Sequence, residues 1–221
     1  MNIYPAFPRL SYLGLLISLV FFFVVAPFFS VGAGSRLMLD LSILMILFIA
    51  VYISSDSIRN TVIAILLASP WLVRLFHVSV QVDEMTLACT ILFFAFVIYE
   101  LLRKVFHTYV VTTDTLFAAI AVYILTGIFW GLVFTLLESL WPGSFTLTIP
   151  QSNQVGQSSF GHDLMYYSFV SLTTLGYGDL TAISRPAQFL SVLEAMMGQI
   201  YLTVIIARLV GMHIAGNRGD V

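Results

Sequence analysis

Long apolar runs separated by short polar stretches make up most of this chain. A helix needs about 20 mainly apolar residues to cross the hydrocarbon core of a bilayer. Six runs approach or exceed that length and predict six membrane-spanning helices, at 10–29, 37–53, 58–80, 85–102, 115–140 and 187–210. A seventh run, 163–173, is too short to span and predicts a re-entrant helix just before the last span.

Residues at the ends of these runs indicate where the helices begin. Asp114 and Asp163 are suited to N-cap positions, because a side-chain oxygen there accepts a hydrogen bond from a free backbone amide. Pro186 suits the first turn of the last span, where its missing N–H is not needed. The first run is longer than the roughly 7–15 apolar residues of a secretory signal, so we expect it to remain as a helix.

The composition indicates a membrane protein of the all-α class. The chain is 60% hydrophobic and 9% charged, with a mean hydropathy of +1.01, whereas soluble domains carry about 25% charged residues. The net charge of −2 gives no indication of nucleic-acid binding. The single cysteine, Cys89, lies in an apolar run and is expected to be a packing residue.

A stretch with alternating glycines interrupts the apolar pattern: Thr173-Thr174-Leu175-Gly176-Tyr177-Gly178-Asp179. Gly176 and Gly178 can adopt backbone angles that other residues avoid, so the strand can turn successive carbonyl oxygens toward one axis. Several copies around that axis would form stacked oxygen cages that replace the hydration shell of an ion. A glycine-rich turn is the alternative. The paired threonines, Tyr177, Asp179 and the flanking apolar runs favour the ion site.

The heptapeptide resembles the filter signature of potassium channels, with Leu175 where valine is more common. The resemblance extends over 114–212 and implies a homotetramer in which each chain contributes backbone carbonyls to bound K⁺. The Thr174 hydroxyl would complete the innermost ion site. Because carbonyls coordinate the ion, we expect Leu175 to preserve selectivity. The implied filter residues are Thr174, Leu175, Gly176, Tyr177 and Gly178, with K⁺ bound by the carbonyls of the first four.

The same resemblance implies a set of residues that support the filter. The run 163–173 resembles the pore helix, whose C-terminal end would direct a partial negative charge toward the ion. Tyr166 and Tyr167 resemble an aromatic pair that packs around the filter, with interfacial anchoring as the alternative. Glu138 resembles a carboxylate that holds the segment after the filter, with simple surface exposure as the alternative. The full set of expected supports is Glu138, Asp163, Tyr166, Tyr167, Thr173, Asp179 and Glu194.

The last span contains a carboxylate, Glu194, for which the sequence leaves two positions open. An intramembrane carboxylate needs a partner or water. Glu194 either lies behind the filter, where Ser171 or Thr173 would donate to it, or faces the cavity and concentrates cations. We favour the first position. The expected gate and cavity residues are Gly198, Gln199, Leu202, Thr203 and Ile206, of which Leu202 and Ile206 are the apolar candidates for a constriction.

Small residues on the last two spans indicate bending or close approach. Gly198 occupies the position at which the resemblance places an inner-helix glycine, and it is either a hinge or a site of close helix packing. Gly127 and Gly131 form a small-xxx-small pair on the fifth span, which we expect to pack against the sixth.

The first four spans match six-span potassium channels in number and order alone, which divides the chain into 1–109 and 110–221. Voltage sensing needs about 3–4 basic residues per subunit on a moving helix, and the run 85–102 contains none. Arg103 and Lys104 follow it in an expected interfacial linker, 103–107, suited to anionic lipid. Arg74 stands alone on the third span. Steep voltage gating is therefore not expected.

Basic residues also predict the orientation. The resemblance implies that the filter loop enters from outside. Arg36 and Arg185 then lie outside, and the inner set is Arg9, Arg59, Arg103, Lys104, Arg208 and Arg218. Both termini are expected to be cytoplasmic, in the cell membrane. No cytosolic ligand-binding module is expected after the last span.

These features predict a bacterial-type, six-span channel that conducts K⁺ passively through a homotetrameric pore and is not an enzyme. The expected partners are K⁺, membrane lipids and further copies of the chain, without nucleic acid and without a cofactor other than the permeant ion. Two alternatives remain. One is a non-conducting polytopic subunit or scaffold. The other is a potassium transporter subunit, although related transporter loops are usually degenerate.

Overall fold

The computed structural model describes residues 11–25, 58–76, 84–107, 112–147 and 160–217. These residues form helices and one two-stranded sheet. In chain order the elements are α1 (Ser11–Val25), α3 (Ile58–Phe76), α4 (Glu84–His107), α5 (Thr113–Leu140), β1 (Phe145–Leu147), α6 (Phe160–Leu172), β2 (Leu180–Ala182) and α7 (Arg185–Asn217).

Three helices among the described residues are long and apolar enough to cross a bilayer: Glu84–His107, Thr113–Leu140 and Arg185–Met212. α1 and α3 contain the shorter apolar stretches Tyr12–Phe21 and Asn60–Ser69. The predicted second span, 37–53, lies outside the described residues. The protein is therefore a predominantly helical membrane protein, and the count of six spans stays a prediction.

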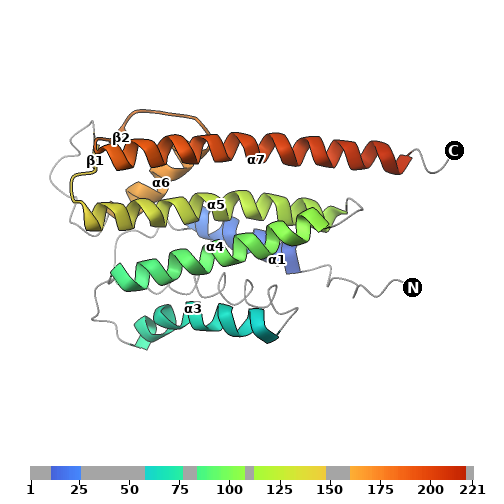
Figure 1. Cartoon of the computed structure of the whole chain (residues 1–221), viewed down its shortest axis with the longest axis horizontal. Helices are drawn as coiled ribbons and strands as arrows, with labels where there is room; N and C mark the ends of the chain where they lie inside the picture. Colours follow the sequence, from blue (N-terminus) through green and yellow to red (C-terminus); the bar gives the residue numbers. More distant parts are fainter. Residues whose placement is uncertain (1–10, 26–57, 77–83, 108–111, 148–159, 218–221) are drawn as a thin grey trace.

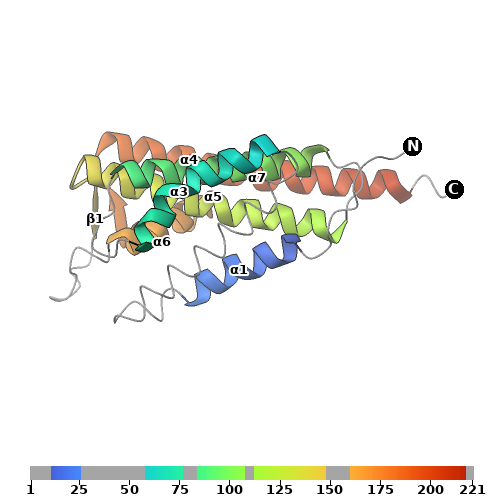
Figure 2. The same cartoon turned by 90° about the horizontal axis from the view of Figure 1, so that it is seen from below.

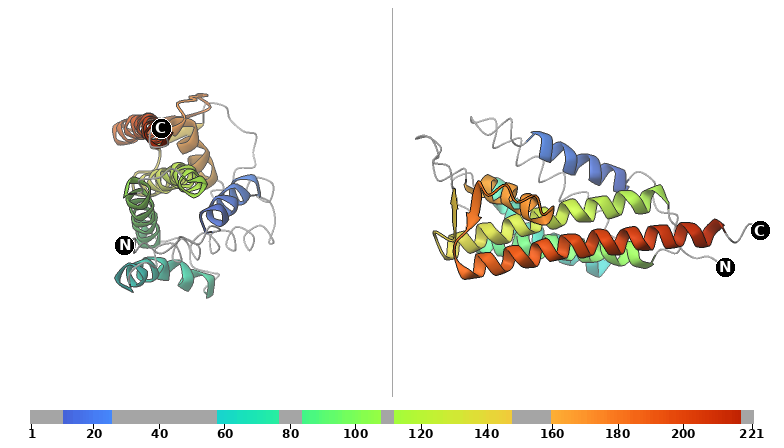
Figure 3. Two further views of the ribbon diagram at one scale, coloured as in Figure 1. Left: turned by 90° about the vertical axis from the view of Figure 1, so that its right-hand side faces the viewer. Right: turned by 90° about the horizontal axis from the view of Figure 1, so that it is seen from above.

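α5 is the central helix of the arrangement. It packs against α1, α4, α6 and α7, and Figure 3 shows these helices around it when viewed along their length. α3 lies on the outer side of α4 (Figure 1), and α1 covers another side of α5 (Figure 2). Val122 and Leu125 of α5 are fully buried in one cluster with Leu15 of α1 and Leu101 of α4. Burial on several sides suits a helix that is apolar around its circumference.

Two predicted N-caps are wrong, because both helices begin earlier than expected. Thr112 caps α5: its hydroxyl accepts from the Thr115 amide at 3.3 Å, and the Thr115 hydroxyl accepts from the Thr112 amide at 3.4 Å. Asp114 and Asp163 instead lie in the first turns of α5 and α6. The helix dipole favours a carboxylate in the first turn as well as at the cap, so the sequence does not separate the two positions.

Two other helices extend beyond their predicted limits. α7 begins at Arg185, where the Ser184 hydroxyl accepts from the Ala187 amide at 3.3 Å, and it continues to Asn217 rather than ending at 210. α4 continues to His107, so the predicted interfacial linker 103–107 is helical. Lys104 and His107 occupy its last turn, where basic side chains are favoured by the helix dipole.

A short antiparallel sheet joins the segments before α6 and after the filter stretch. β1 pairs with β2 in the register Phe145↔Ala182 and Leu147↔Leu180. Phe145 also lies against the rings of Phe134 and Tyr167, with centroids 5.4 and 5.2 Å away. The sheet and this aromatic cluster hold α5, α6 and the start of α7 together at one end of the molecule (Figure 1).

Candidate functional site

The filter stretch, 173–179, has an alternating backbone conformation. The φ angles of Thr174, Gly176 and Gly178 are +58°, +58° and +76°. Thr174 is the only non-glycine residue with positive φ among those that the structure describes. A residue of this kind is uncommon outside functional sites, because its Cβ approaches the backbone. Alternation of left-handed with other backbone angles turns successive amides to one side of a strand, and carbonyls to the other.

The amides of this stretch are bound by the end of α6. The Thr173 amide donates to the Phe169 carbonyl at 3.1 Å, and the Leu175 amide donates to the Val170 carbonyl at 2.9 Å. No donor among the described residues bonds to the carbonyls of Thr174, Leu175, Gly176 or Tyr177. Residues 173–178 are all exposed in the single chain. The amides therefore face α6, and the carbonyls remain available to a ligand.

At its N-terminal end the filter stretch meets α7. The Thr174 hydroxyl donates to the Thr173 carbonyl at 2.7 Å and accepts from Gln199 Nε2 at 3.2 Å. The structure thus brings two sequence-predicted residues, Thr174 and Gln199, into direct contact. The Tyr123 hydroxyl from α5 donates to the Leu172 carbonyl at 3.4 Å. This tyrosine was not singled out from the sequence.

Near the C-terminal end of the filter stretch, two tyrosines of α6 take different roles. The Tyr166 hydroxyl donates to Asp179 Oδ2 at 2.8 Å, while Asp179 Oδ1 accepts from the Leu180 amide at 3.0 Å. Desolvation, followed by the hydrogen bond to Asp179, raises the pKa of Tyr166 to about 12, so the phenol stays neutral and remains a donor. Tyr167 is buried, and its hydroxyl lies 2.7 Å from Ser191 Oγ of α7.

Glu138 binds the turn between α5 and β1 and does not contact the segment after the filter directly. Its Oε1 accepts from the Gly143 amide at 2.7 Å, and its Oε2 accepts from the Phe145 amide at 3.2 Å. The neighbouring Ser144 carbonyl accepts from the Ile183 amide at 2.8 Å. The resemblance therefore identified a residue whose contact with the segment after the filter is indirect, through the β1–β2 sheet.

These contacts surround the filter stretch with α5, α6, the sheet and α7. Residues 110–214, which contain α5, α6, the sheet and all but the last three residues of α7, match the family model described as "Ion channel". Comparison with curated proteins and with solved structures found no match. We refer to residues 110–214, after this match, as the ion-channel domain. The match supports an ion channel.

Within the ion-channel domain, Glu194 is fully buried behind α6. Its Oε1 lies 2.5 Å from the Ser168 hydroxyl. The predicted partners were Ser171 and Thr173, and that part of the prediction is wrong, because Thr173 donates to the Phe169 carbonyl instead. α7 crosses α6 about one helical turn before Ser171, which places Ser168 opposite Glu194. Of the two positions left open, the one behind the filter matches the structure.

The glycines of this domain allow backbones to approach closely. A Cβ at Gly198 would lie 2.3 Å from the Leu172 carbonyl oxygen, and α7 is an unbroken helix through this position. Close packing therefore accounts for Gly198 in this conformation, and bending there stays a prediction. Cβ atoms at Gly127 and Gly131 would lie 2.3 Å from Phe169 and 2.7 Å from Met165, both on α6. The expected packing of this pair against the sixth span is wrong, since α6 fills that face of α5.

The predicted cavity stripe of α7 is exposed in the single chain. Gln199, Leu202, Thr203 and Ile206 lie away from α5 and α6, and Ile206 is 58% exposed. The buried positions of the same helix include Glu194 and Ile205. The structure thus separates the predicted stripe from the packed face, and its role in a cavity stays a prediction.

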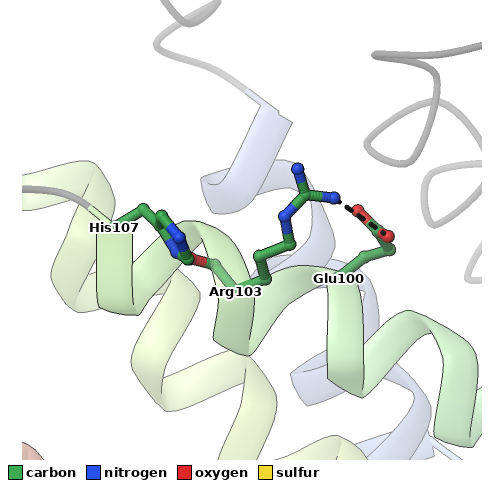
Figure 4. Close-up of polar contacts among 3 residues, drawn as sticks. All are labelled: Glu100, Arg103 and His107. Carbon is green, nitrogen blue, oxygen red and sulfur yellow. Dashed lines mark hydrogen bonds and ion pairs between the residues drawn. The ribbon is translucent and has the colours of Figure 1, made fainter.

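α4, which precedes the ion-channel domain, contains a buried charged residue, Glu100, that sequence reasoning missed. Glu100 of α4 is 4% exposed and lies 3.8 Å from Arg103 Nη1, and His107 Nδ1 lies 2.8 Å from the Arg103 carbonyl (Figure 4). Arg208 of α7 donates to the carbonyls of Val105 and Phe106 at the end of α4. Glu100 could have been identified from the sequence, because it is an acidic residue inside the apolar run 85–102. The side chain of Arg74 lies outside the described residues.

Proposed function

We propose that the chain forms a potassium-selective channel, which conducts K⁺ passively through a pore built by four copies. The carrying observation is the filter stretch, in which the amides bond to α6 while the carbonyls of Thr174, Leu175, Gly176 and Tyr177 have no partner among the described residues. Such carbonyls replace the hydration shell of K⁺ when several strands converge. Gly178 allows the backbone to continue this alternation, and Asp179 is bonded outside the ion path.

The same geometry supports an oligomer. One chain supplies a single strand, which leaves a bound ion open to water on its other sides. Leu175 and Tyr177 are 54% and 66% exposed in the single chain, and α7 carries large exposed apolar residues such as Phe189 and Ile206. Further copies around the filter axis would cover part of these surfaces and complete the oxygen cages. The family that the sequence resembles uses four.

The wider proposal concerns the membrane context. We infer six spans in the cell membrane, with both termini cytoplasmic and lipid around α1, α3 and α4. The C-terminal ends of α4 and α7 lie at the end of the molecule opposite α6 and the sheet, and these helix ends carry Arg103, Lys104 and Arg208; α7 begins, with Arg185, at the end of the sheet (Figure 1), which supports this orientation. The proposed activity needs no cofactor beyond the permeant ion.

Potassium flux into liposomes that contain the purified full-length protein tests this function. We expect flux that runs down the K⁺ gradient and reversal potentials that follow K⁺ rather than Na⁺. Equal permeability to the two ions would contradict potassium selectivity. Absence of any flux from a correctly assembled protein would favour a scaffold, and flux that requires a second ion gradient would favour a transporter.

A further inference from the structure

Three helices of the ion-channel domain meet at one buried hydroxyl group. Ser168 of α6 is 0% exposed, and its Oγ lies 2.7 Å from the Gly127 carbonyl of α5 and 2.5 Å from Glu194 Oε1 of α7. Both distances are those of hydrogen bonds. The proposed function does not use this cluster in ion binding, because it lies behind α6 and away from the filter carbonyls.

The number of hydrogens in this cluster depends on the state of the carboxyl group. A serine hydroxyl has one hydrogen, and a carbonyl oxygen can only accept. If Glu194 were ionised, Ser168 would face two acceptors with one hydrogen, and one oxygen pair would be in contact without a hydrogen between them. If Glu194 is protonated, it donates to Ser168, which donates to Gly127. The neutral form thus satisfies both contacts.

A second cluster in the same domain has the same arrangement with a neutral donor. Tyr167 lies 2.7 Å from Ser191 Oγ, and Ser191 donates to the Ala187 carbonyl at 2.7 Å. The phenol of Tyr167 therefore supplies the second hydrogen. Glu194 occupies the corresponding place in its own cluster, and it can supply a hydrogen only as a carboxylic acid.

The surroundings of Glu194 also favour the neutral form. Its Oε2 is buried and has no donor among the residues that the structure describes. From α5 the titratable group that interacts with it is the phenol of Tyr123, and from α6 it is contacted by the uncharged Ser168. No basic side chain among the described residues pairs with it. An unpaired ion in such a site is costly, since a buried charge is stable only when it is paired and hydrogen-bonded.

We propose that Glu194 is a proton-binding site, whose carboxylic acid joins α5, α6 and α7 through Ser168 and keeps the filter in its conducting form. Loss of this proton to water leaves a buried carboxylate and breaks the chain of hydrogen bonds. Ser168 precedes Val170 by two residues, and the Val170 carbonyl holds the amides of Leu175 and Gly176. A shift of α6 would therefore move the filter strand. This inference rests on the proposed function for its effect on conduction, but not for the proton itself.

Infrared spectroscopy of the purified full-length protein detects the proton without any measurement of flux. We expect the carbonyl stretch of a protonated carboxylic acid at neutral pH, its disappearance at alkaline pH, and its absence from Glu194→Gln. Glu100→Gln is the matched control, because Glu100 is also a buried helical glutamate but has Arg103 as an ion partner. That variant should keep the band. A neutral-pH spectrum without a band that depends on Glu194 would overturn the proposal.

Potassium flux then tests the link to the filter. In the wild-type protein we expect a reversible loss of flux at alkaline pH, approaching about tenfold per pH unit once the proton is released. Glu194→Gln should remove this dependence, because an amide donates to Ser168 and has no proton to lose in this range. The same alkaline loss in both proteins would overturn the link. If the Glu194→Gln variant does not assemble, Glu194→Asp is measured in its place. A carboxylic acid band at the wild-type frequency in that variant would show that the proton is bound by another residue.

Discussion

The ion-channel domain and the helices before it are held together by different kinds of contact. In the domain, side-chain hydrogen bonds join separate elements, as in Ser168 to Gly127 and Tyr166 to Asp179. In α1, α3 and α4, the described hydroxyls of Ser18, Ser69 and Thr90 donate to carbonyls of their own helices. The buried contact between α1, α4 and α5 is largely apolar.

This difference indicates which part of the molecule must be positioned accurately. Hydrogen bonds are directional, whereas apolar packing is not, so an apolar interface tolerates sliding and rotation better. Polar links between the two parts lie near the ends of the helices. Glu84 of α4 accepts from Ser139 at one end, and Arg208 of α7 donates to the last carbonyls of α4 at the other. Movement of α4 would therefore act on the C-terminal end of α5 through Ser139 and on α7 through Arg208.

The largest effect is expected from a Cβ in the filter itself. Gly176 has φ +58° with no atom within 4 Å of an added Cβ, so Gly176→Ala introduces backbone strain without a clash. Left-handed geometry costs a non-glycine residue about 1–2 kcal/mol, and the strain recurs in every copy. We expect potassium flux to be abolished while the assembled protein remains intact, as measured by liposome flux and size-exclusion chromatography.

Gly143→Ala is the matched control for this substitution. Gly143 has φ +87° in the outer turn and also has no atom within 4 Å of an added Cβ. Its intrinsic strain is similar, but it lies outside the filter, so flux should persist. Equal retention of flux in the two variants would mean that the filter stretch does not form the ion path.

A smaller effect, in the opposite direction, is expected at the inner end of α7. If Leu202 and Ile206 converge from four copies, the narrow apolar pore excludes water and blocks ions. Ile206→Asp should wet this constriction and raise resting potassium conductance. Val204→Asp is the control, because Val204 is also exposed but lies ~200° around the helix.

Single-channel recording in planar bilayers measures the resting conductance of both variants. On a lipid-facing side, a carboxylate at membrane depth costs at least about 2.5 kcal/mol and should impair assembly instead. A well-assembled Ile206→Asp protein with wild-type resting conductance would place the gate elsewhere, with the filter as the next candidate.

Packing differences between the two regions predict a moderate effect on stability. Gly198→Ala places a Cβ 2.3 Å from the Leu172 carbonyl and must push α7 away from α6. We expect destabilisation of about 1–3 kcal/mol, as for other overpacked sites. Gly14→Ala in α1 meets no atom within 4 Å and should stabilise its helix by about 0.5–1 kcal/mol. Thermal unfolding in detergent measures both, and a neutral Gly198→Ala would argue for a flexible contact there.

The smallest effect is expected for the dependence of open probability on membrane voltage. In α4 the basic residues Arg103, Lys104 and His107 lie in the last two turns, and Glu100 pairs with Arg103. Each charge that crosses the membrane contributes about 2.3 kcal/mol per 100 mV, and about 3–4 charges per subunit make gating steep. Open probability should therefore change only weakly over ~100 mV. A steep activation curve would contradict this expectation. It would indicate a voltage sensor in the helices before the ion-channel domain, with Arg74 as the first residue to test.

Features that depend on nearby residues could be predicted from the sequence. The filter stretch was recognisable because Gly176 and Gly178 alternate with larger residues, and alternate residues of that stretch have positive φ. The positions of α5, α6 and α7 followed from the lengths of their apolar runs. Helix starts were less accurate, because Asp114 and Asp163 favour a first turn as strongly as a cap.

Contacts between helices were decided by the tertiary structure. The sequence by itself determined a helical membrane protein with a filter-like stretch, because hydrophobic length and glycine freedom are local properties. It did not determine that Glu194 meets Ser168 instead of Ser171, or that Gly127 packs on α6 instead of α7. Those partners depend on how far each helix is rotated and shifted against its neighbour. One helical turn is about 5.4 Å, so a shift of that size exchanges one hydrogen-bond partner for another.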